Sequence, residues 1–347
     1  MPESRLLSYR AAVLEAIAEA MRADPGIVVM GEDVGAAGGV FKQTEGLFSE
    51  FGPSRVIDTP ISESGAFGMA VGAAMTGLHP LFEVMFGDFL TQVMDQLVNQ
   101  AAKVHYMSAG QYSVPLVLRT TMGTGSNLGP QHSQRLYAWA AHVPGLKVAL
   151  PSTPADAKGL FSAALRDHNP VILFEDRQLY GMKGEVPAGE HVVPLGLADT
   201  KRMGKDATIV ALGSFVHTSL EAAGRLAQEG IEAEVVDLRS LVPLDLETLV
   251  ASVRKTNRVL VVDGAPRQYG AAGEIAASLA EAAFDWLDAP VMRLAAEDIP
   301  IPFSRNLESL VHPDAARIVE AVRALVAGGT GVQAGTSGSS CRASSAI

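Results

Sequence analysis

The sequence predicts an α/β protein built from two open, mainly parallel sheets covered by helices. Short apolar segments bounded by turn residues alternate with helical segments in the first half of the chain. A second alternation follows a stretch rich in proline, glycine and charge. Such alternation is typical of parallel sheets, because parallel strands need long crossover connections that usually contain a helix. The 347 residues are enough for two ordinary domains.

The first domain is expected over residues 1–185. Its strand-like segments are residues 26–30, 55–58, 80–85, 115–120, 146–150 and 171–175, with helical stretches such as 8–22 and 154–167 between them. A further helix is expected to open at Gly87 and to run through Gln92, Gln96 and Asn99. Residues 186–205 are expected to be a linker, because turn residues and charges gather there.

The second domain is expected over residues 206–327. Strands at 207–213, 233–238 and 258–263 alternate with helices at 216–229, 246–255 and 271–283, and a last helix spans 314–326. No Gly-x-Gly-x-x-Gly follows the first of these strands, which favours a packing and assembly domain over a nucleotide site. The tail, 328–347, is almost free of large apolar residues and is predicted to be disordered.

Bulk properties exclude several classes of protein. The net charge of −11 argues against nucleic-acid or anionic-membrane partners. The single cysteine, Cys341, excludes an internal disulfide and any cysteine-based metal site. Neither a signal segment nor a membrane-length apolar run is present. A soluble protein of a reducing compartment, most simply the cytoplasm, is expected.

The segment from Asp58 to Gly65 is the first candidate site. It connects a predicted strand to a glycine-rich helix over residues 65–77, which places Glu63 at the carboxyl end of a strand. Ligands of open α/β sheets bind at this edge, and a carboxylate among apolar neighbours is suited to proton transfer. The alternative is a structural role, as an acidic residue in the first turn of a helix.

Three motifs in order carry a family resemblance: Ile61-Ser62-Glu63-Ser64-Gly65, Gln131-His132-Ser133-Gln134 and Asp156-Ala157-Lys158-Gly159-Leu160. Together they resemble the beta subunit of the thiamine-diphosphate-dependent first component of 2-oxo acid dehydrogenase complexes. That family includes the pyruvate, branched-chain and acetoin dehydrogenases. The resemblance runs from about residue 9 to about residue 326. It implies a transketolase-like pyrimidine-binding domain followed by a transketolase C-terminal-like domain.

The resemblance assigns roles to five residues. Glu63 would hydrogen-bond the pyrimidine ring of the cofactor, and His132 would be an active-site acid or base toward an oxyanion or the lipoyl thiol. Phe89 would stack on the pyrimidine, with Gln92 one turn farther along facing the same pocket. Glu32, beside Asp33, would lie in an acidic passage between two cofactor sites. Structural roles are the alternatives: His132 as a hydrogen-bonding loop residue, Phe89 as a core aromatic, and Glu32 and Asp33 as acids of a solvated loop.

The resemblance also implies a structural potassium ion. The matching positions are Leu116, Ala164, Leu165, Asp167 and Asn169. Backbone carbonyls left free at the end of a helix are suitable ligands. The alternative is a simple helix C-cap before Pro170.

One motif is missing. Enzymes of this type hold the diphosphate through magnesium with a Gly-Asp-Gly and a later Asn, and this chain contains no Gly-Asp-Gly. A separate alpha subunit is therefore expected to hold magnesium and the diphosphate, in a heterotetramer of two alpha and two beta subunits. A lipoyl acyltransferase core is the other expected partner.

The sequence thus predicts an oxidoreductase subunit that is active only with its alpha partner. The enzyme would cleave its substrate next to the carbonyl and transfer the acyl unit to a lipoyl group. Pyruvate, a branched-chain 2-oxo acid and acetoin all remain open as substrates. The alternative is a non-catalytic assembly or electron-transfer subunit that retains the fold. A nucleotide-binding module is disfavoured, because no phosphate-loop motif is present.

Overall fold

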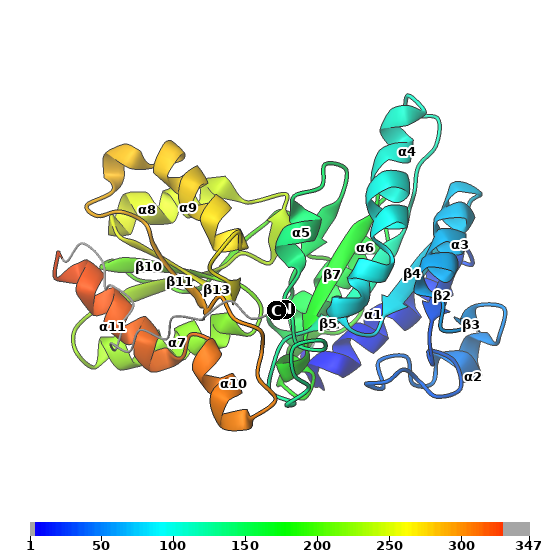
Figure 1. Cartoon of the computed structure of the whole chain (residues 1–347), viewed down its shortest axis with the longest axis horizontal. Helices are drawn as coiled ribbons and strands as arrows, with labels where there is room; N and C mark the ends of the chain where they lie inside the picture. Colours follow the sequence, from blue (N-terminus) through cyan, green and yellow to red (C-terminus); the bar gives the residue numbers. More distant parts are fainter. Residues whose placement is uncertain (1–3, 329–347) are drawn as a thin grey trace, which may run out of the picture.

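The computed structural model describes residues 4–328. They form two α/β domains side by side (Figure 1). Except for Gly328, the predicted tail lies outside the described residues, as does Cys341. No helix of the described part is long and apolar enough to cross a lipid bilayer.

The first domain is built on a seven-stranded sheet of order β12-β6-β7-β5-β4-β2-β3. The strands are β2 (Ile27–Gly31), β3 (Val56–Asp58), β4 (His79–Val84), β5 (Val117–Met122), β6 (Lys147–Ala149), β7 (Val171–Asp176) and β12 (Ser240–Val242). All neighbours are parallel except β12, which pairs antiparallel with β6. The predicted, mainly parallel sheet is confirmed, but its β12 edge strand comes from the second half of the sequence.

Helices cover both faces of this sheet (Figure 1). One face packs against α1 (Tyr9–Ala23) and α6 (Pro154–Ala164), and the other against α3 (Glu63–Met75) and its neighbours. Capping explains where two of them begin. The Ser8 hydroxyl accepts a hydrogen bond from the Ala11 amide, and the Thr153 hydroxyl accepts one from the Asp156 amide. The remaining helices of this domain are α2 (Leu47–Phe51), α4 (Ala102–Met107), α5 (Tyr137–Ala141) and η3 (Arg177–Leu179).

The helix expected to open at Gly87 is broken in the structure. A 3₁₀ helix, η1 (Gly87–Gln92), is followed by a π-helix, η2 (Gln96–Ala101), before α4 begins. The prediction of one regular helix was therefore wrong. The tight first turn brings Gly87 close to the sheet. A Cβ added at Gly87 would lie 3.1 Å from the Thr121 carbonyl oxygen, so glycine suits this position.

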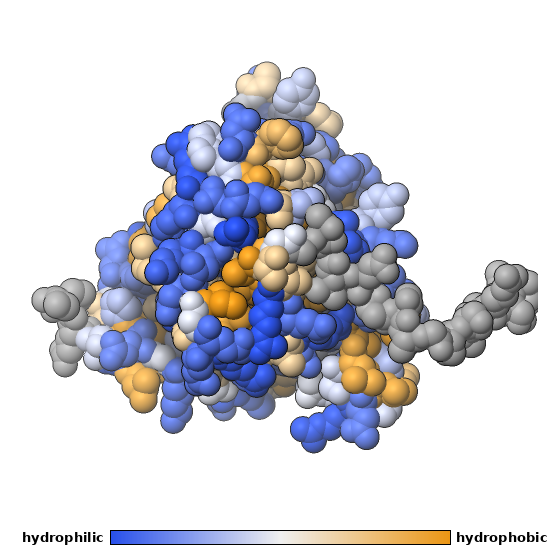
Figure 2. Space-filling view, turned by 90° about the vertical axis from the view of Figure 1, so that its left-hand side faces the viewer, coloured by the Kyte–Doolittle hydropathy of each residue, from blue (hydrophilic) through white to orange (hydrophobic). Residues whose placement is uncertain are grey.

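The second domain is built on a five-stranded sheet of order β14-β13-β10-β11-β9. Its strands are β9 (Asp199–Arg202), β10 (Ala207–Ala211), β11 (Ala233–Asp237), β13 (Val259–Pro266) and β14 (Met292–Ala296). The helices are α7 (Phe215–Ala227), α8 (Leu246–Thr256), α9 (Ala271–Ala282), η4 (Phe284–Trp286), α10 (Arg305–Val311) and α11 (Ala315–Val326). The end of the molecule formed by this domain is mostly hydrophilic, with scattered apolar side chains (Figure 2).

The stretch expected to be a linker is partly structured. Within it, β9 pairs antiparallel with β11 and joins the second sheet. Just before it, β8 (Lys183–Pro187) pairs antiparallel with β1 (Ser4–Ser8). The connection between the domains is therefore held at both of its ends.

The two domains share one apolar core. It contains residues from the α3 side of the first sheet, such as Leu118 and Phe174, and residues from the second domain, such as Val236, Leu249 and Leu279. Burial of apolar side chains stabilises their packing by roughly 2 kcal/mol each. This shared core favours one fixed arrangement of the domains.

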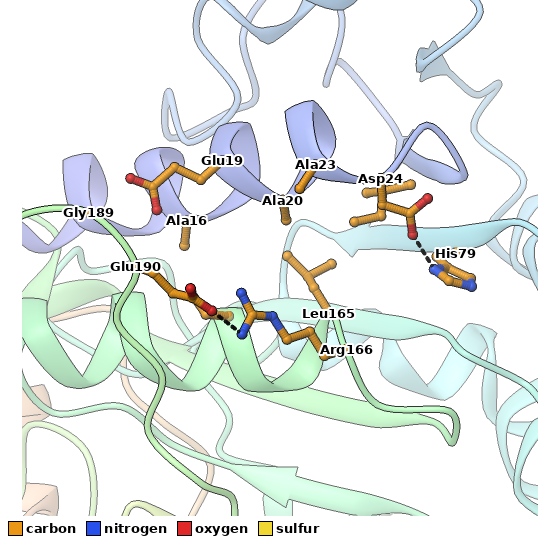
Figure 3. Close-up of a pocket in the computed structure, with 12 residues that line it drawn as sticks. Ala16, Glu19, Ala20, Ala23, Asp24, His79, Leu165, Arg166, Gly189 and Glu190 are labelled. Carbon is orange, nitrogen blue, oxygen red and sulfur yellow. Dashed lines mark ion pairs between the residues drawn. The ribbon is translucent and has the colours of Figure 1, made fainter.

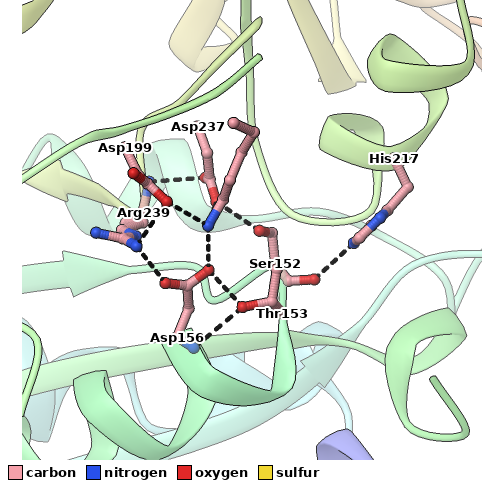
Figure 4. A network of polar contacts seen from close by, with 8 residues as sticks. Ser152, Thr153, Asp156, Asp199, His217, Asp237 and Arg239 are labelled. Carbon is pink, nitrogen blue, oxygen red and sulfur yellow. Dashed lines mark hydrogen bonds and ion pairs between the residues drawn. The ribbon is translucent and has the colours of Figure 1, made fainter. Parts of the chain in front are cut away.

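A buried polar network adds to the domain contact (Figure 4). Asp156 of α6 accepts from Lys201 Nζ at 2.6 Å and from Arg239 Nη2 at 2.6 Å. Both cations also reach Asp199, at 2.7 and 2.8 Å. Burial, together with the Asp156 carboxylate beside it, raises the pKa of Asp237 to about 6. The network joins α6 to β9 and to the end of β11, and so helps to set the angle between the domains.

Candidate active site

Glu63 is the first residue of α3, directly after its N-cap Ser62. It is half-buried, at the edge of the sheet where the parallel strands end. We call the narrow hollow beside it the Glu63 recess. Its lining residues are Glu32, Glu63, Phe82, Glu83, Val84, Met85 and Phe89. The structure thus brings together three of the five residues assigned by resemblance, from loops that follow three different strands.

Glu32 follows β2 and is the second acid of the recess. Burial raises the pKa of Glu32, and the charges of Glu63 and Asp33 add to the shift. Like charges close together disfavour simultaneous ionisation. Glu32 and Glu63 both line the recess, whereas Asp33 is exposed.

His132 lies against the same recess through shared aromatic neighbours. Its ring meets Phe86 edge-on, with centroids 4.8 Å apart, and Phe89 in the same way at 5.3 Å. Because Phe89 also lines the Glu63 recess, one aromatic ring separates the predicted acid–base histidine from the predicted carboxylate. The two residues are 69 positions apart in sequence and meet only in the fold.

Gln92 is not among the residues of the recess. It is the last residue of η1 and is exposed. Residues three apart eclipse in a 3₁₀ helix, so Gln92 lies on the side of η1 that carries Phe89. The structure therefore leaves Gln92 at the rim.

Asp88 is a site residue that sequence reasoning missed. Its buried Oδ1 accepts from the Gln134 amide at 3.2 Å and from Gln134 Nε2 at 2.8 Å. These bonds fasten η1 to the segment 123–134, which we call the histidine loop. The Gly87-Asp88 pair was the only local signal, and it resembles an incomplete magnesium motif more than a loop anchor.

A buried ionic triad, also unforeseen, lies beneath the sheet edge. Arg119 of β5 donates through Nε to Glu175 at 2.8 Å, and its Nη1 lies 3.2 Å from Glu83. Burial raises the pKa of Glu83, and burial raises that of Glu175 to about 7 against the opposing effect of Arg119. Two carboxylates thus share one cation. The triad ties together the ends of β4, β5 and β7, two of which carry the loops of the site.

The residues predicted to hold potassium lie around the end of α6, away from the Glu63 recess. The Ala164 carbonyl accepts from the Asp167 amide at 3.1 Å, and the Leu116 carbonyl from the Val171 amide at 3.0 Å. Lys147 is ion-paired to the Asp167 carboxylate. A cation here would therefore rely on backbone carbonyls, including those of Leu165 and Asn169, more than on that carboxylate.

A larger cavity, of about 550 Å³, lies elsewhere, between α1 and α6 (Figure 3). Two pairs of its polar side chains contact each other: Arg166 with Glu190 at 2.6 Å, and His79 with Asp24 at 2.7 Å. It is lined in part by Ile27 and His79, where β2 and β4 begin. Because the ends of these strands carry Glu32 and the Glu83–Phe89 wall, this cavity is on the opposite edge of the sheet from the candidate site.

Comparisons with known proteins agree with this geometry. Residues 5–183 match the family "Transketolase, pyrimidine binding domain", and residues 196–318 match "Transketolase, C-terminal domain". The chain is 46% identical over 324 residues to the pyruvate dehydrogenase E1 component subunit beta of Rhizobium meliloti, covering 93% of this chain and 70% of that protein.

Two further relatives have different names. The acetoin:2,6-dichlorophenolindophenol oxidoreductase subunit beta of Bacillus subtilis is 48% identical, with 91% of this chain and 96% of that protein covered. The 2-oxoisovalerate dehydrogenase subunit beta of Bacillus subtilis is 45% identical, with 89% and 96% covered. Among solved structures, a split-gene transketolase in an inactive beta4 tetramer matches with a TM-score of 0.76 and 26% identity, covering 92% of this chain and 98% of that one.

Proposed function

Because this chain belongs to the transketolase-like family of beta subunits of 2-oxo acid and acetoin dehydrogenases, we propose that the Glu63 recess is the pyrimidine half of a thiamine diphosphate site. The protein is a beta subunit of a thiamine-diphosphate-dependent oxidoreductase that acts on an oxo group. The proposal depends on one observation: Phe89 lines the same recess as Glu63 and packs edge-on against His132.

The recess fits the pyrimidine end of the cofactor. It offers a carboxylate from Glu63, an aromatic wall from Phe89 and strand-end residues of β4. A planar nitrogen heterocycle can stack on an aromatic ring. Its ring nitrogen can hydrogen-bond a carboxylate that accepts or holds a proton. Among residues 4–328 there is no group of three or more acids, histidines or cysteines that could hold a divalent ion. We therefore assign magnesium and the diphosphate to an alpha subunit.

Each residue then has a defined task. When bound, thiamine diphosphate supplies the electron sink for cleavage next to the substrate carbonyl. Glu63 would share a proton with the pyrimidine ring, and Phe89 would stack on that ring. His132 would donate a proton to the oxygen of the reacting carbonyl, or to the lipoyl sulfur that is released as a thiolate. Glu32, whose pKa burial raises, would lie beside Glu63 and begin the passage toward the other cofactor site.

The partners in this proposal are an alpha subunit and a lipoyl acyltransferase core. An apolar groove of about 1250 Å³ between the domains, lined by residues such as Met94, Val98, Trp139 and Tyr269, is a suitable surface for a subunit contact. Tyr269 is 98% exposed in the single chain. Permanent subunit interfaces are large and apolar. The assembly we propose is a heterotetramer of two alpha and two beta subunits.

Two finer points belong to the same proposal. The carbonyls around Ala164 hold a structural potassium ion, whose removal should lower the melting temperature without changing the chemistry. The compartment is the cytoplasm, in line with a chain of one cysteine.

Glu63→Gln tests the function. The amide keeps the shape of the side chain but cannot share a proton, so turnover of enzyme reconstituted with its alpha subunit should fall by about 10²- to 10⁴-fold. Folding should be unchanged, because Glu63 is only half-buried. Glu45→Gln, at an exposed acid of the same domain, is the matched control. Turnover close to that of the wild type in Glu63→Gln would favour the alternative of a non-catalytic subunit.

A further inference from the structure

We propose that the C-terminal domain takes part in the reaction by holding the histidine loop in place through Glu308 and Phe303. These two side chains would be positioning residues that act through His132. The inference rests on the role of His132 in the proposed function, and it gives the second domain a task beyond packing and assembly.

The histidine loop has little conformational preference of its own. Gly123, Gly125 and Gly129 have φ values of 94°, 94° and 71°, and Asn127 has a φ of 55°. Glycine populates this left-handed region freely, so its presence also allows the loop many other conformations. A side chain carried by such a loop needs external contacts to stay within the short range of positions that catalysis demands.

The first domain supplies contacts at both ends of the loop. Arg177 Nη2 donates to the Gly123 carbonyl at 2.6 Å, and Gln178 Nε2 donates to the Thr124 carbonyl at 3.2 Å. Asp88 holds Gln134 at the other end. The middle of the loop, which includes Gly125, Gly129 and the residues leading to His132, makes none of these bonds.

The second domain contacts that middle. Glu308 of α10 accepts from the Gly125 amide at 3.1 Å through its Oε2, across 183 positions of sequence. The Phe303 ring lies over Gly129, where an added Cβ would be 2.3 Å from Phe303 Cε1. Only glycine permits this approach. Two separate contacts from one segment, residues 303–308, thus fall on residues 125–129, which make none of the first-domain hydrogen bonds given above.

The burial and charge of Glu308 indicate a role in polar contacts as well as in packing. It is only 4% exposed, and burying a carboxylate is costly unless it is well paired. The Glu308 carboxylate is one of the charges that raise the pKa of Arg177, against the larger lowering effect of burial. The Arg177 guanidinium also lies 5.8 Å from the ring centre of Phe86, which packs on His132. Glu308 is therefore linked to His132 along two routes, through the loop backbone and through Arg177 and Phe86.

A double-mutant cycle with His132→Ala separates positioning from general stability. Glu308→Ala and Phe303→Ala should each lower kcat of the reconstituted enzyme by about tenfold, within the range expected for small displacements of a catalytic group. Affinity for thiamine diphosphate, measured by calorimetry, should stay within about twofold, because neither residue lines the Glu63 recess. In the His132→Ala background the same substitutions should change kcat by less than about twofold. Glu308→Gln retains an acceptor oxygen for the Gly125 amide and should recover most of the activity.

Two controls and three outcomes complete the test. Phe284→Ala removes a comparably exposed phenylalanine of the same domain, and Glu320→Gln changes an exposed acid on α11. Both should leave kcat unchanged. Phe303 is 66% exposed, so Phe303→Ala folds even if Glu308→Ala does not. Equal losses of kcat in both backgrounds, or no loss from either substitution, would overturn the positioning role. Unchanged turnover in His132→Ala would instead overturn the proposed function.

Discussion

The glycine-rich face of α3 leads to a prediction with two opposite effects. Gly72 lies inside this helix and is exposed, and a Cβ added there would meet nothing within 4 Å. At Gly68 an added Cβ would make only an ordinary contact, 3.6 Å from Gln96 Cγ. The single chain therefore gives no packing reason for glycine at either position. Gly72→Leu should stabilise the isolated chain and yet disrupt its assembly with the alpha subunit.

The magnitudes follow from the local geometry. Glycine in a helix interior costs about 1 kcal/mol relative to a good helix former, so the isolated variant should gain about that much. This gain corresponds to a rise in melting temperature of roughly 2 °C for a chain of this size. If a partner helix packs on this face, a leucine side chain must enter filled space, at a cost of about 1–3 kcal/mol per interface. Association should therefore weaken by roughly one to two orders of magnitude.

Size-exclusion chromatography with multi-angle light scattering on co-expressed subunits measures the assembly. Thermal unfolding of the isolated chain measures the local gain. Gly224→Leu is the matched control, because Gly224 is also an exposed helix glycine without atoms within 4 Å of an added Cβ, but lies on α7 of the second domain. A fully assembled, active complex from Gly72→Leu would refute the packing argument. Equal loss of assembly in both variants would show that the effect is not specific to α3.

Three other predictions concern the site, pH and the domain contact. His132→Ala should lower transfer to the lipoyl group or an artificial acceptor more than affinity for thiamine diphosphate; a collapse of affinity with unchanged turnover of the saturated enzyme would contradict its role. Burial lowers the pKa of His312 to about 4, so below about pH 6.5 the unfolded chain binds a proton there that the folded chain does not. The free energy of unfolding should thus fall by about 2 kcal/mol from pH 7 to pH 5. In urea unfolding, the His312→Gln variant should lose less stability over this range than the wild type. Lys201→Met leaves Asp156 and Asp199 with Arg239 as their cation and removes the cation beside Asp237, so it should cost about 3 kcal/mol. Exposed Lys183→Met should be neutral in the same unfolding assay.

The strands were predictable because burial on both faces makes them short and apolar. Strands β2, β3, β4, β5, β6 and β7 all lie within the predicted segments or within a few residues of them. The exceptions have physical causes. Strand β12 contains only residues 240–242 and pairs with a strand about ninety positions away, so it leaves no local pattern. The η1–η2 break at 87–101 depends on the close approach of Gly87 to Thr121, which the sequence does not reveal.

In the candidate site, too, residues in local motifs were predictable and residues that make distant contacts were not. Glu63 and His132 stand in distinctive motifs, so their positions at the carboxyl edge of the first sheet could be predicted. The residues that contact the histidine loop and hold it in place could not be predicted. Asp88 reaches the histidine loop across 46 positions, and Glu308 reaches it across 183. Neither has a spacing or a neighbour that marks it, because a supporting contact is specified only by the folded surface of its partner.

The Asp156-Ala157-Lys158-Gly159-Leu160 motif shows how the two kinds of residue are connected. Lys158 is fully buried and bonds Glu19 of α1 at 3.1 Å and the Gly189 carbonyl at 2.6 Å. A Cβ at Gly159 would lie 2.3 Å from Val193 Cγ2, so glycine allows the domain connection to lie against α6. Asp156 continues the contact into the second domain through Lys201 and Arg239.

These three contacts run from α1 through the connection to β9, and they set where the second domain lies. The position of the second domain in turn decides whether Glu308 can reach Gly125. Within a rigid shared core, a displacement of about 1 Å at the domain contact would be passed on to the histidine loop. This motif, one of the three that carry the family resemblance, contains no residue of the Glu63 recess. Its place in the chemistry is therefore indirect: it fixes the domain that we propose holds His132, and substitutions in it should lower turnover as well as stability.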